Sequence, residues 1–180
     1  LGIRGCGVSM PFKEACIELV DEMDASAKAI ASINTIVNTD GHLKAYNTDY
    51  IAIAQLLDSH KVPKDTTFAL AGSGGMAKAV ASALRDGGYR NGVIVARNQA
   101  TGAALAAGCG YDWQPQLAAH RPQMLINTTP VGMAGGAEAD DLAFAADAID
   151  RADIIFDVVA IPVETPLIVR GRAQGKQVIT

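Results

Sequence analysis

Residues 68–80, FALAGSGGMAKAV, join a short apolar run, a glycine-rich turn and an alanine-rich helical pattern. Within them, the hexapeptide GSGGMA at 72–77 matches the G-x-G-x-x-[G/A] spacing of a nucleotide-binding turn between a strand and a helix. The first glycine permits a tight turn, the second lets the backbone approach a pyrophosphate, and Ala77 lets the helix pack closely on the sheet. We expect the phosphates to meet free N–H groups at the positive end of the helix dipole. A glycine turn that serves packing alone is the alternative.

From residue 68 onward, the chain alternates between strand-like and helix-like segments. Strand-like runs occur at 68–72, 92–96, 123–128 and 153–159, and helical patterns occur at 76–88, 99–108, 140–150 and 165–174. Such alternation predicts an α/β fold with a Rossmann-type, doubly wound parallel sheet. The last residues, GKQVIT, predict one further strand.

The first third of the chain has a different pattern. Residues 14–30 place apolar side chains three or four apart, which predicts one helix. Residues 34–49 hold two strand-like runs around Asp40-Gly41, a strong hairpin signal, and residues 50–60 predict a helix capped by Thr48 or Asp49. The polar KVPKDT at 61–66 marks a boundary. We therefore expect part of an N-terminal α/β domain at 1–64 and a nucleotide-binding domain at 65–165.

The composition restricts the function classes. Of 180 residues, 49% are hydrophobic and 19% charged, which suffices for a packed core. The net charge of -4, without a basic stripe, argues against nucleic acid and against an anionic membrane surface. No apolar run approaches the roughly 20 residues of a membrane span. Three cysteines without CxxC spacing argue against a metal site and favour a reducing cytoplasm. The missing initial methionine and the uncovered final strand suggest truncation at both ends.

The end of the second predicted strand indicates which dinucleotide binds. NAD-binding turns are followed, about 20 residues later, by a carboxylate that binds the ribose hydroxyls. Here the strand ends in Ala96-Arg97-Asn98, without a carboxylate. A guanidinium pairs with a 2′-phosphate that a carboxylate would repel, so Arg97 predicts NADP(H). An ordinary solvated arginine is the alternative.

Three polar features precede the glycine-rich turn: Ser9 with Lys13, Asn34-Thr35, and residues 47–49 (NTD). Lys13 follows Pro11, which we expect to begin a helix with Lys13 in its first turn. A lysine and an aspartate within reach of each other, here Lys13 and Asp49, could move a proton at a bound hydroxyl. Taken singly, Lys13 is better explained as a solvated surface lysine and Asp49 as a helix cap. The histidines are interpreted as surface residues: His42, His60 and His120.

Several segments, in order over essentially the whole chain, resemble the shikimate dehydrogenase family. GVSMPFKEA resembles V-T-x-P-F-K, and ASINTIVNTDGHLKAYNTD resembles G-A-x-N-T…D-G…N-T-D. AGSGGMAKAV resembles the family's glycine-rich loop, and VARNQ stands where the family has N-R-T. INTTPVGM and DVVAIPVETPL resemble N-x-T-P-x-G-M and D-x-x-Y-x-P-x-x-T-P-L.

This resemblance implies a two-domain enzyme of aromatic amino acid biosynthesis that reversibly reduces 3-dehydroshikimate to shikimate with NADPH. It implies that residues 1–64 are part of the substrate-binding domain, and that residues 166–180 begin a segment that returns to that domain. It implies that Lys13 and Asp49 are catalytic, with Lys13 relaying the proton, and that Ser9, Asn34 and Asp49 bind substrate. The implied cofactor-binding residues are Gly72, Ser73, Gly74, Gly75, Met76, Arg97, Asn127, Thr128 and Val158. A monomer or a homodimer is expected, with no metal.

Four departures from the family pattern bear on the substrate. Ser9 replaces threonine, Tyr50 replaces a common glycine, Ala96 replaces asparagine, and Ala160 replaces a tyrosine. A pocket without that tyrosine loses one hydrogen-bond donor, so the substrate could be another cyclic hydroxy-acid. Two alternatives remain open: a non-catalytic module that senses NADP(H), and another two-domain dehydrogenase such as a methylenetetrahydrofolate dehydrogenase.

Overall fold

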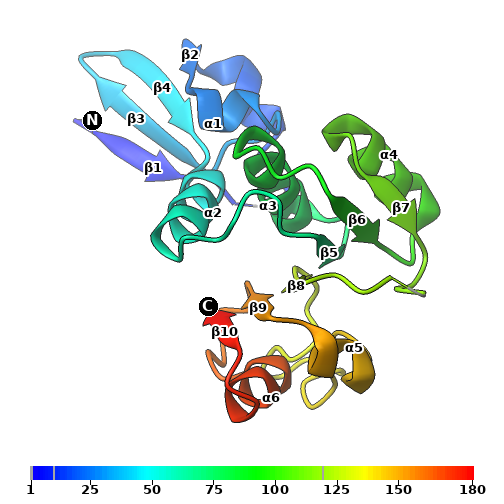
Figure 1. The fold of residues 1–180 in the computed structure, drawn as a ribbon. Coiled ribbons are helices and arrows are strands. Elements are labelled where there is room, and N and C mark those ends of the chain that lie inside the picture. The colour runs from blue at the N-terminus through cyan, green and yellow to red at the C-terminus, as the bar shows by residue number, and fades with distance from the viewer. Residues whose placement is uncertain (1, 10, 119) are drawn as a thin grey trace. The chain divides into compact units, whose positions relative to one another are not determined.

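The computed structural model describes residues 2–9, 11–118 and 120–180, so Met10 of the lysine motif lies outside the described residues. The chain divides into two compact units, Leu1–Gln55 and Leu56–Thr180, each with its own sheet (Figure 1). The three-part domain division that we expect from the sequence stays a prediction.

The first unit contains a four-stranded sheet with the order β1-β3-β4-β2. Its strands are β1 (Gly5–Gly7), β2 (Glu22–Met23), β3 (Thr35–Thr39) and β4 (His42–Tyr46). β3 and β4 form an antiparallel hairpin whose two turn residues, Asp40 and Gly41, have φ angles of 52° and 94°. Positive φ at both positions is what a tight hairpin turn requires, so the Asp-Gly prediction is confirmed.

The single helix predicted over 14–30 is wrong. This stretch instead forms the 3₁₀ helix η1 (Ala15–Leu19), then β2, then the short helix α1 (Ala25–Lys28). The backbone N–H of Leu43 donates to the Asp21 carboxylate at 2.8 Å, and Asp24 caps α1 by accepting from the Ser26 N–H at 2.9 Å. Pairing of β2 with β4 therefore overrides the helical periodicity, because a partner distant in sequence cannot be read from local spacing.

The prediction that Pro11 begins a helix is also wrong. The N–H of Phe12 donates to the Ser9 carbonyl at 2.9 Å, and residues 11–14 form a turn ahead of η1. Lys13 therefore lies in this turn and not in the first turn of a helix.

The second unit contains six parallel strands in the order β10-β9-β8-β5-β6-β7. Numbered within the unit, the order is that of a doubly wound nucleotide-binding sheet, so the predicted fold class is confirmed. The strand β7 is not predicted by the sequence, because its residues, DWQ, lack the adjacent aliphatic side chains that mark the other strands of this unit. The strands are β5 (Phe68–Ala71), β6 (Gly92–Val95), β7 (Asp112–Gln114), β8 (Met124–Asn127), β9 (Ile154–Asp157) and β10 (Gln177–Ile179).

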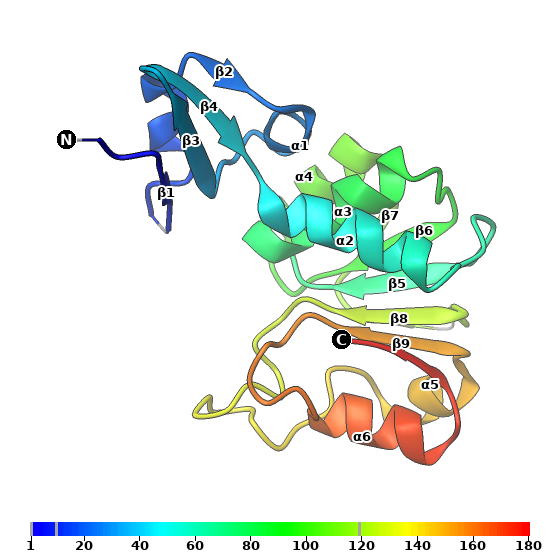
Figure 2. The ribbon, with the colours of Figure 1, turned by 90° about the vertical axis from the view of Figure 1, so that its left-hand side faces the viewer.

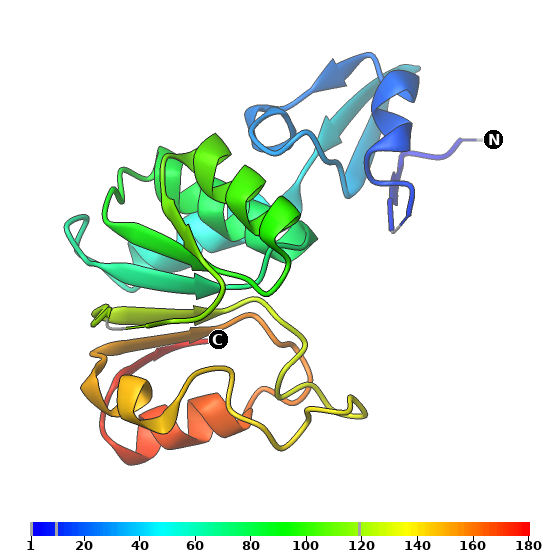
Figure 3. The same cartoon turned by 90° about the vertical axis from the view of Figure 1, so that its right-hand side faces the viewer.

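Helices cover both faces of this sheet. α3 (Gly75–Asp86) and α4 (Gln99–Cys109) lie on one face, and α5 (Ala146–Arg151) and α6 (Pro166–Ala173) lie on the other (Figures 2 and 3). Because the crossovers from β5 and from β8 go to opposite faces, a crevice is expected at the carboxyl ends of these neighbouring strands. α5 begins later than predicted, since residues 140–145 are irregular.

The helix α2 (Thr48–Ser59) begins in the first unit and ends in the second. In the part of the chain that the structure describes, no helix has the length and apolar character needed to cross a membrane.

Candidate functional site

The glycine-rich turn begins at Gly72, where β5 ends. Gly72 has a φ of +117°, and its N–H donates to the Val95 carbonyl at 2.9 Å. A Cβ at this position would lie 2.5 Å from Oγ1 of Thr128, which itself donates to the Ala71 carbonyl at 2.6 Å. Only glycine satisfies both the backbone angle and this close approach.

The next two glycines face open space. A Cβ built on Gly74 or on Gly75 meets nothing within 4 Å, and Gly74 is the N-cap of the 12-residue helix α3. Ala77 is completely buried, as its predicted packing role requires. A free volume in front of the first N–H groups of a helix fits a phosphate group, so the residues present fit a dinucleotide pyrophosphate. Ser73 stabilises this turn by a hydrogen bond, because its Oγ lies 2.7 Å from Oγ1 of Thr101 on α4.

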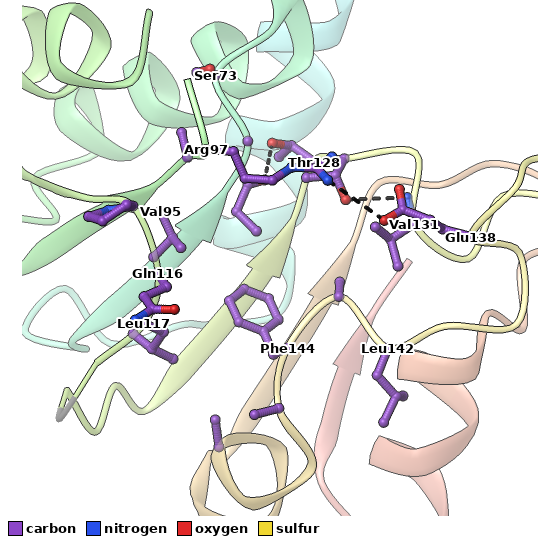
Figure 4. Close-up of a pocket in the computed structure, with 18 of the residues that line it drawn as sticks. Ser73, Val95, Arg97, Gln116, Leu117, Thr128, Val131, Glu138, Leu142 and Phe144 are labelled. Atoms are coloured by element: carbon purple, nitrogen blue, oxygen red, sulfur yellow. Dashed lines mark hydrogen bonds and ion pairs between the residues drawn. The ribbon is translucent and has the colours of Figure 1, made fainter. Parts of the chain in front are cut away.

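A cavity of about 690 Å³ lies in the second unit beside this turn (Figure 4). Its volume falls in the range of small-molecule sites. Five predicted cofactor-binding residues line it: Gly72, Ser73, Gly74, Arg97 and Thr128. Four others are not among its lining residues: Gly75, Met76, Asn127 and Val158.

Arg97 follows β6, and its side chain is 85% exposed. Its Nη1 lies 3.9 Å from Oε1 of Glu138, which also lines the cavity. Figure 4 shows the two side chains pointing toward one another. No local pattern in the sequence relates Glu138 to Arg97, so the sequence does not predict this contact.

Asn127 is fully buried at the end of β8. Its Nδ2 donates to the Val131 carbonyl at 3.1 Å and to Oδ1 of Asp157 at 3.0 Å. Its Oδ1 accepts from the N–H of Thr129 at 3.0 Å and from Oγ1 of the same residue at 2.6 Å. The amide therefore holds the loop after β8, and its contribution to the cavity is to place that loop.

Asp157, at the end of β9, is the buried partner of Asn127, and no local pattern in the sequence relates the two. Its Oδ1 also accepts from the Val159 N–H at 3.0 Å, and its Oδ2 accepts from Oγ1 of Thr165 at 2.7 Å. Burial raises the pKa of the Asp157 carboxyl, and these hydrogen bonds oppose the rise. Val158 is half-buried, and its N–H donates to the Asn127 carbonyl at 3.1 Å. Asn127 and Asp157 thus join the carboxyl ends of two neighbouring strands.

In the first unit, the structure brings Lys13 and Asp49 together. Nζ of Lys13 lies 3.3 Å from Oδ2 of Asp49, although the residues are 36 positions apart. Their side chains are 30% and 34% exposed, so both are partly shielded and remain reachable by a ligand. The carbonyl of Lys13 accepts from the Ile33 N–H at 2.9 Å, which ties the turn of Lys13 to the segment ahead of β3. The pair presents an ammonium and a carboxylate at one place on this unit.

Asn34 orients the start of α2. Its Oδ1 accepts from Oγ1 of Thr35 at 3.0 Å, and from the N–H and Oγ1 of Thr48 at 2.9 and 3.1 Å. Its Nδ2 has no hydrogen-bond partner among the residues that the structure describes, so this group can donate to a ligand hydroxyl. Ser9 is exposed, and the N–H of its neighbour Val8 donates to the Asn34 carbonyl at 2.8 Å.

The predicted caps of α2, Thr48 and Asp49, are wrong. Asn47 caps the helix, because its Oδ1 accepts from the Tyr50 N–H at 3.0 Å. Its Nδ2 donates to the Ser32 carbonyl at 3.0 Å, and the residue is buried. With the cap supplied by Asn47, the Asp49 carboxylate remains available to Lys13. Across residues 2–9, 11–118 and 120–180, no group of three or more His, Cys, Asp or Glu side chains could hold a metal ion.

Comparison with known proteins identifies related sequences. The family "Shikimate dehydrogenase substrate binding domain" matches residues 1–36. A shikimate dehydrogenase-like protein of Haemophilus influenzae is 52% identical over 180 residues, which are 100% of this chain and 66% of that protein. A shikimate dehydrogenase (NADP(+)) of Paramagnetospirillum magneticum is 33% identical over 190 residues, covering 99% of this chain and 67% of that protein.

Two solved structures resemble this one. Shikimate 5-dehydrogenase from Thermus thermophilus, in complex with NADP(H) and shikimate, has a TM-score of 0.85 at 27% identity. Quinate dehydrogenase from Corynebacterium glutamicum, in complex with NAD, has a TM-score of 0.85 at 26% identity. In both cases the alignment covers 99% of this chain and 67% of the other.

The chain spans about two thirds of the length of these relatives, at 66% and 67%. The similarity extends over both units and includes the lysine, Asn-Thr-Asp and glycine-rich segments. The chain belongs to the shikimate dehydrogenase family.

Proposed function

We propose that this protein is an NADP-dependent oxidoreductase that interconverts a ring ketone and a ring hydroxyl of shikimate or a closely related cyclic hydroxy-acid. The observation that carries this proposal is the contact of 3.3 Å between Nζ of Lys13 and Oδ2 of Asp49. A cofactor-binding module alone has no need of a partly shielded ammonium–carboxylate pair in its other unit, so the pair favours catalysis over sensing.

Lys13 is the proposed proton relay. In the direction of reduction, the reacting carbonyl oxygen takes a proton from Nζ of Lys13 as its carbon takes a hydride, and the reverse occurs on oxidation. The nicotinamide cofactor, when bound, supplies or accepts that hydride. The Asp49 carboxylate holds the ammonium in place, and Asn34 and Ser9 hydrogen-bond to ring hydroxyls.

The cofactor-binding residues remain those expected from the sequence. Gly72 to Gly75 and the N-terminus of α3 would hold the pyrophosphate, and Arg97 would pair with a 2′-phosphate. Thr128 and Val158 would lie along the ribose and nicotinamide. The open space at Gly74 and Gly75 and the relative named as a shikimate dehydrogenase (NADP(+)) both support this assignment.

The substrate is proposed as a class. Ala160 is exposed and stands where the family pattern has a tyrosine, so one hydroxyl donor is replaced by a methyl group. A site that loses one donor loses transition-state binding to the corresponding ring oxygen. We therefore include quinate-like acids beside shikimate.

A cytoplasmic location and a monomeric or homodimeric state also stay predictions. The free thiols of Cys6, Cys16 and Cys109 agree with the predicted location.

A steady-state assay of the full-length protein tests the proposal. NADPH absorbance is followed with shikimate, quinate and related cyclic acids, in both directions, and NADPH binding is measured separately. We expect turnover of at least one acid with NADP(H). Binding of NADPH without turnover of any of them would favour the sensor and contradict the dehydrogenase. Turnover of methylenetetrahydrofolate instead would assign the protein to the other class of dehydrogenase.

A further inference from the structure

Glu138 places a carboxylate opposite Arg97. In the proposed function, Arg97 is the residue that makes the site prefer NADP to NAD. The two side chains reach the cavity from separate segments: Arg97 from the end of β6, and Glu138 from the loop between β8 and α5. The distance of 3.9 Å between Nη1 and Oε1 is that of an ion pair.

The backbone at Glu138 is hydrogen-bonded within its loop. Its carbonyl accepts from the N–H of Gly132 at 2.9 Å and from the N–H of Asp141 at 3.2 Å. Gly132 has a φ of +87°, and a Cβ there would lie 3.1 Å from Cβ of Thr165, so the loop is packed at this point. The Glu138 side chain is 42% exposed against 85% for Arg97. The carboxylate is therefore the less exposed partner of the two.

We propose that Glu138 is a selectivity-determining residue that competes with the 2′-phosphate of NADP for Arg97 and so lowers the preference for NADP over NAD. This inference depends on the proposed function, in which Arg97 receives the 2′-phosphate. A phosphate that pairs with Arg97 must displace the Glu138 carboxylate or lie beside it, and both carry negative charge. A ribose 2′-hydroxyl carries no charge, so NAD does not meet this repulsion.

The exposure of this ion pair to solvent sets how much the loss of the carboxylate should change NADPH affinity. Exposed ion pairs contribute little because water and salt screen them, so removing the carboxylate should strengthen NADPH binding by about three- to tenfold at low salt. The effect should shrink as ionic strength rises, since both partners are at least 42% exposed.

The test compares Glu138→Gln with Asp140→Asn, which makes the same change in net charge in the same loop. Dissociation constants are measured for NADPH and NADH, and for adenosine 2′,5′-bisphosphate against adenosine 5′-monophosphate, which carry the 2′-phosphate contrast without the nicotinamide. We expect tighter binding of NADPH and of the bisphosphate for Glu138→Gln alone, with NADH and the monophosphate changed less than about twofold. In an Arg97→Ala background, Glu138→Gln should change the NADPH-to-NADH ratio less than it does in the wild-type background, because no guanidinium remains for which the carboxylate and the phosphate compete.

Three results would overturn the role of Glu138. These are no difference between the two single variants, an equal gain for NADPH and NADH, or a loss of NADPH affinity, which would mean that the carboxylate positions Arg97 for the phosphate. In each of these, selective loss of NADPH binding by Arg97→Ala would leave the proposed function standing. A wild-type protein that binds neither dinucleotide would instead refute the proposed function together with this inference.

Discussion

At the scale of single residues, the candidate catalytic pair depends on a third side chain. The first turn of α2 needs a cap, and Asn47 supplies it through Oδ1. Asp49 lies two residues later, in the same turn, with its carboxylate directed to Lys13. A helix start that used Asp49 as its own cap would have bound that carboxylate to backbone N–H groups. The geometry of the proposed proton relay therefore depends on the identity of residue 47.

Replacing Lys13 by alanine should abolish most of the activity and leave cofactor binding intact. Without Nζ no side chain carries the proton to the reacting oxygen, and positioned general acids contribute about 100-fold or more to kcat. Steady-state kcat and NADPH affinity are the two measurements. Lys28→Ala, which removes an exposed lysine from α1 in the same unit, is the matched control. A variant that kept its kcat would remove Lys13 from the mechanism.

Two glycines of the same turn should respond in opposite ways to alanine. Gly72→Ala introduces a Cβ at φ +117° and 2.5 Å from Thr128 Oγ1, so we expect a loss of about 1–3 kcal/mol in the free energy of unfolding. Gly74→Ala places its Cβ in open space, so stability should change little, while NADPH affinity should fall because the methyl group occupies the phosphate position. Urea unfolding and cofactor titration distinguish these outcomes. Similar unfolding energies for both variants would contradict the packing argument.

At the scale of elements, the sequence predicts those turns, strands and helix starts that depend on interactions between residues close together in the chain. The β5–turn–α3 segment, the Asp40-Gly41 hairpin and the Thr165-Pro166 start of α6 all agree with the structure, because each is specified within a few residues. The helix expected over 14–30 is absent because β2 pairs with β4. Asp157 could not be foreseen as the partner of Asn127, since the pairing of β8 with β9 brings them together. Glu138 could not be foreseen as the partner of Arg97, since the path of the loop after β8 brings them together.

Asp157, at the carboxyl end of β9, should make the free energy of unfolding depend measurably on pH. The pKa of Asp157 is raised by burial, so between the unfolded value near 3.8 and the higher folded value the native state holds more protons than the unfolded state. Stability from this group is therefore present at low pH and is lost as pH rises through that window. Relative to Asp157→Asn, the wild-type free energy of unfolding should fall across this range. A pH-independent difference in urea unfolding would show that Asp157 does not titrate in this way.

At the scale of the whole molecule, the two proposed ligand sites belong to separate compact units. The cavity beside the glycine-rich turn is formed entirely by residues of the second unit, and the Lys13–Asp49 pair lies in the first. Each unit has its own sheet and its own buried cluster, for example Ala27, Ile33 and Ala45 in the first. The cofactor and the substrate should therefore slow amide hydrogen exchange in different parts of the chain.

Hydrogen exchange can test this separation. NADPH should slow amide exchange around residues 71–76 and 95–98, and at saturation near 100 times Kd it should stabilise the protein by about 2.7 kcal/mol. Shikimate, or whichever acid proves to be the substrate, should protect residues near 9, 13, 34 and 49. Protection by NADPH alone that was strongest in residues 2–9 and 11–49 would contradict the assignment of the cofactor to the second unit.

The hydrogen bonds that join Asn127, Asp157 and Thr165 have an evolutionary consequence. Asn127 Nδ2 donates to Asp157 Oδ1 at 3.0 Å and Thr165 Oγ1 donates to Asp157 Oδ2 at 2.7 Å, so the donor and acceptor roles at these positions are complementary. A change at one position leaves a buried group unpaired unless another position changes with it. Descendants of this gene should therefore inherit these side chains as a set, even where mutations elsewhere have altered the substrate.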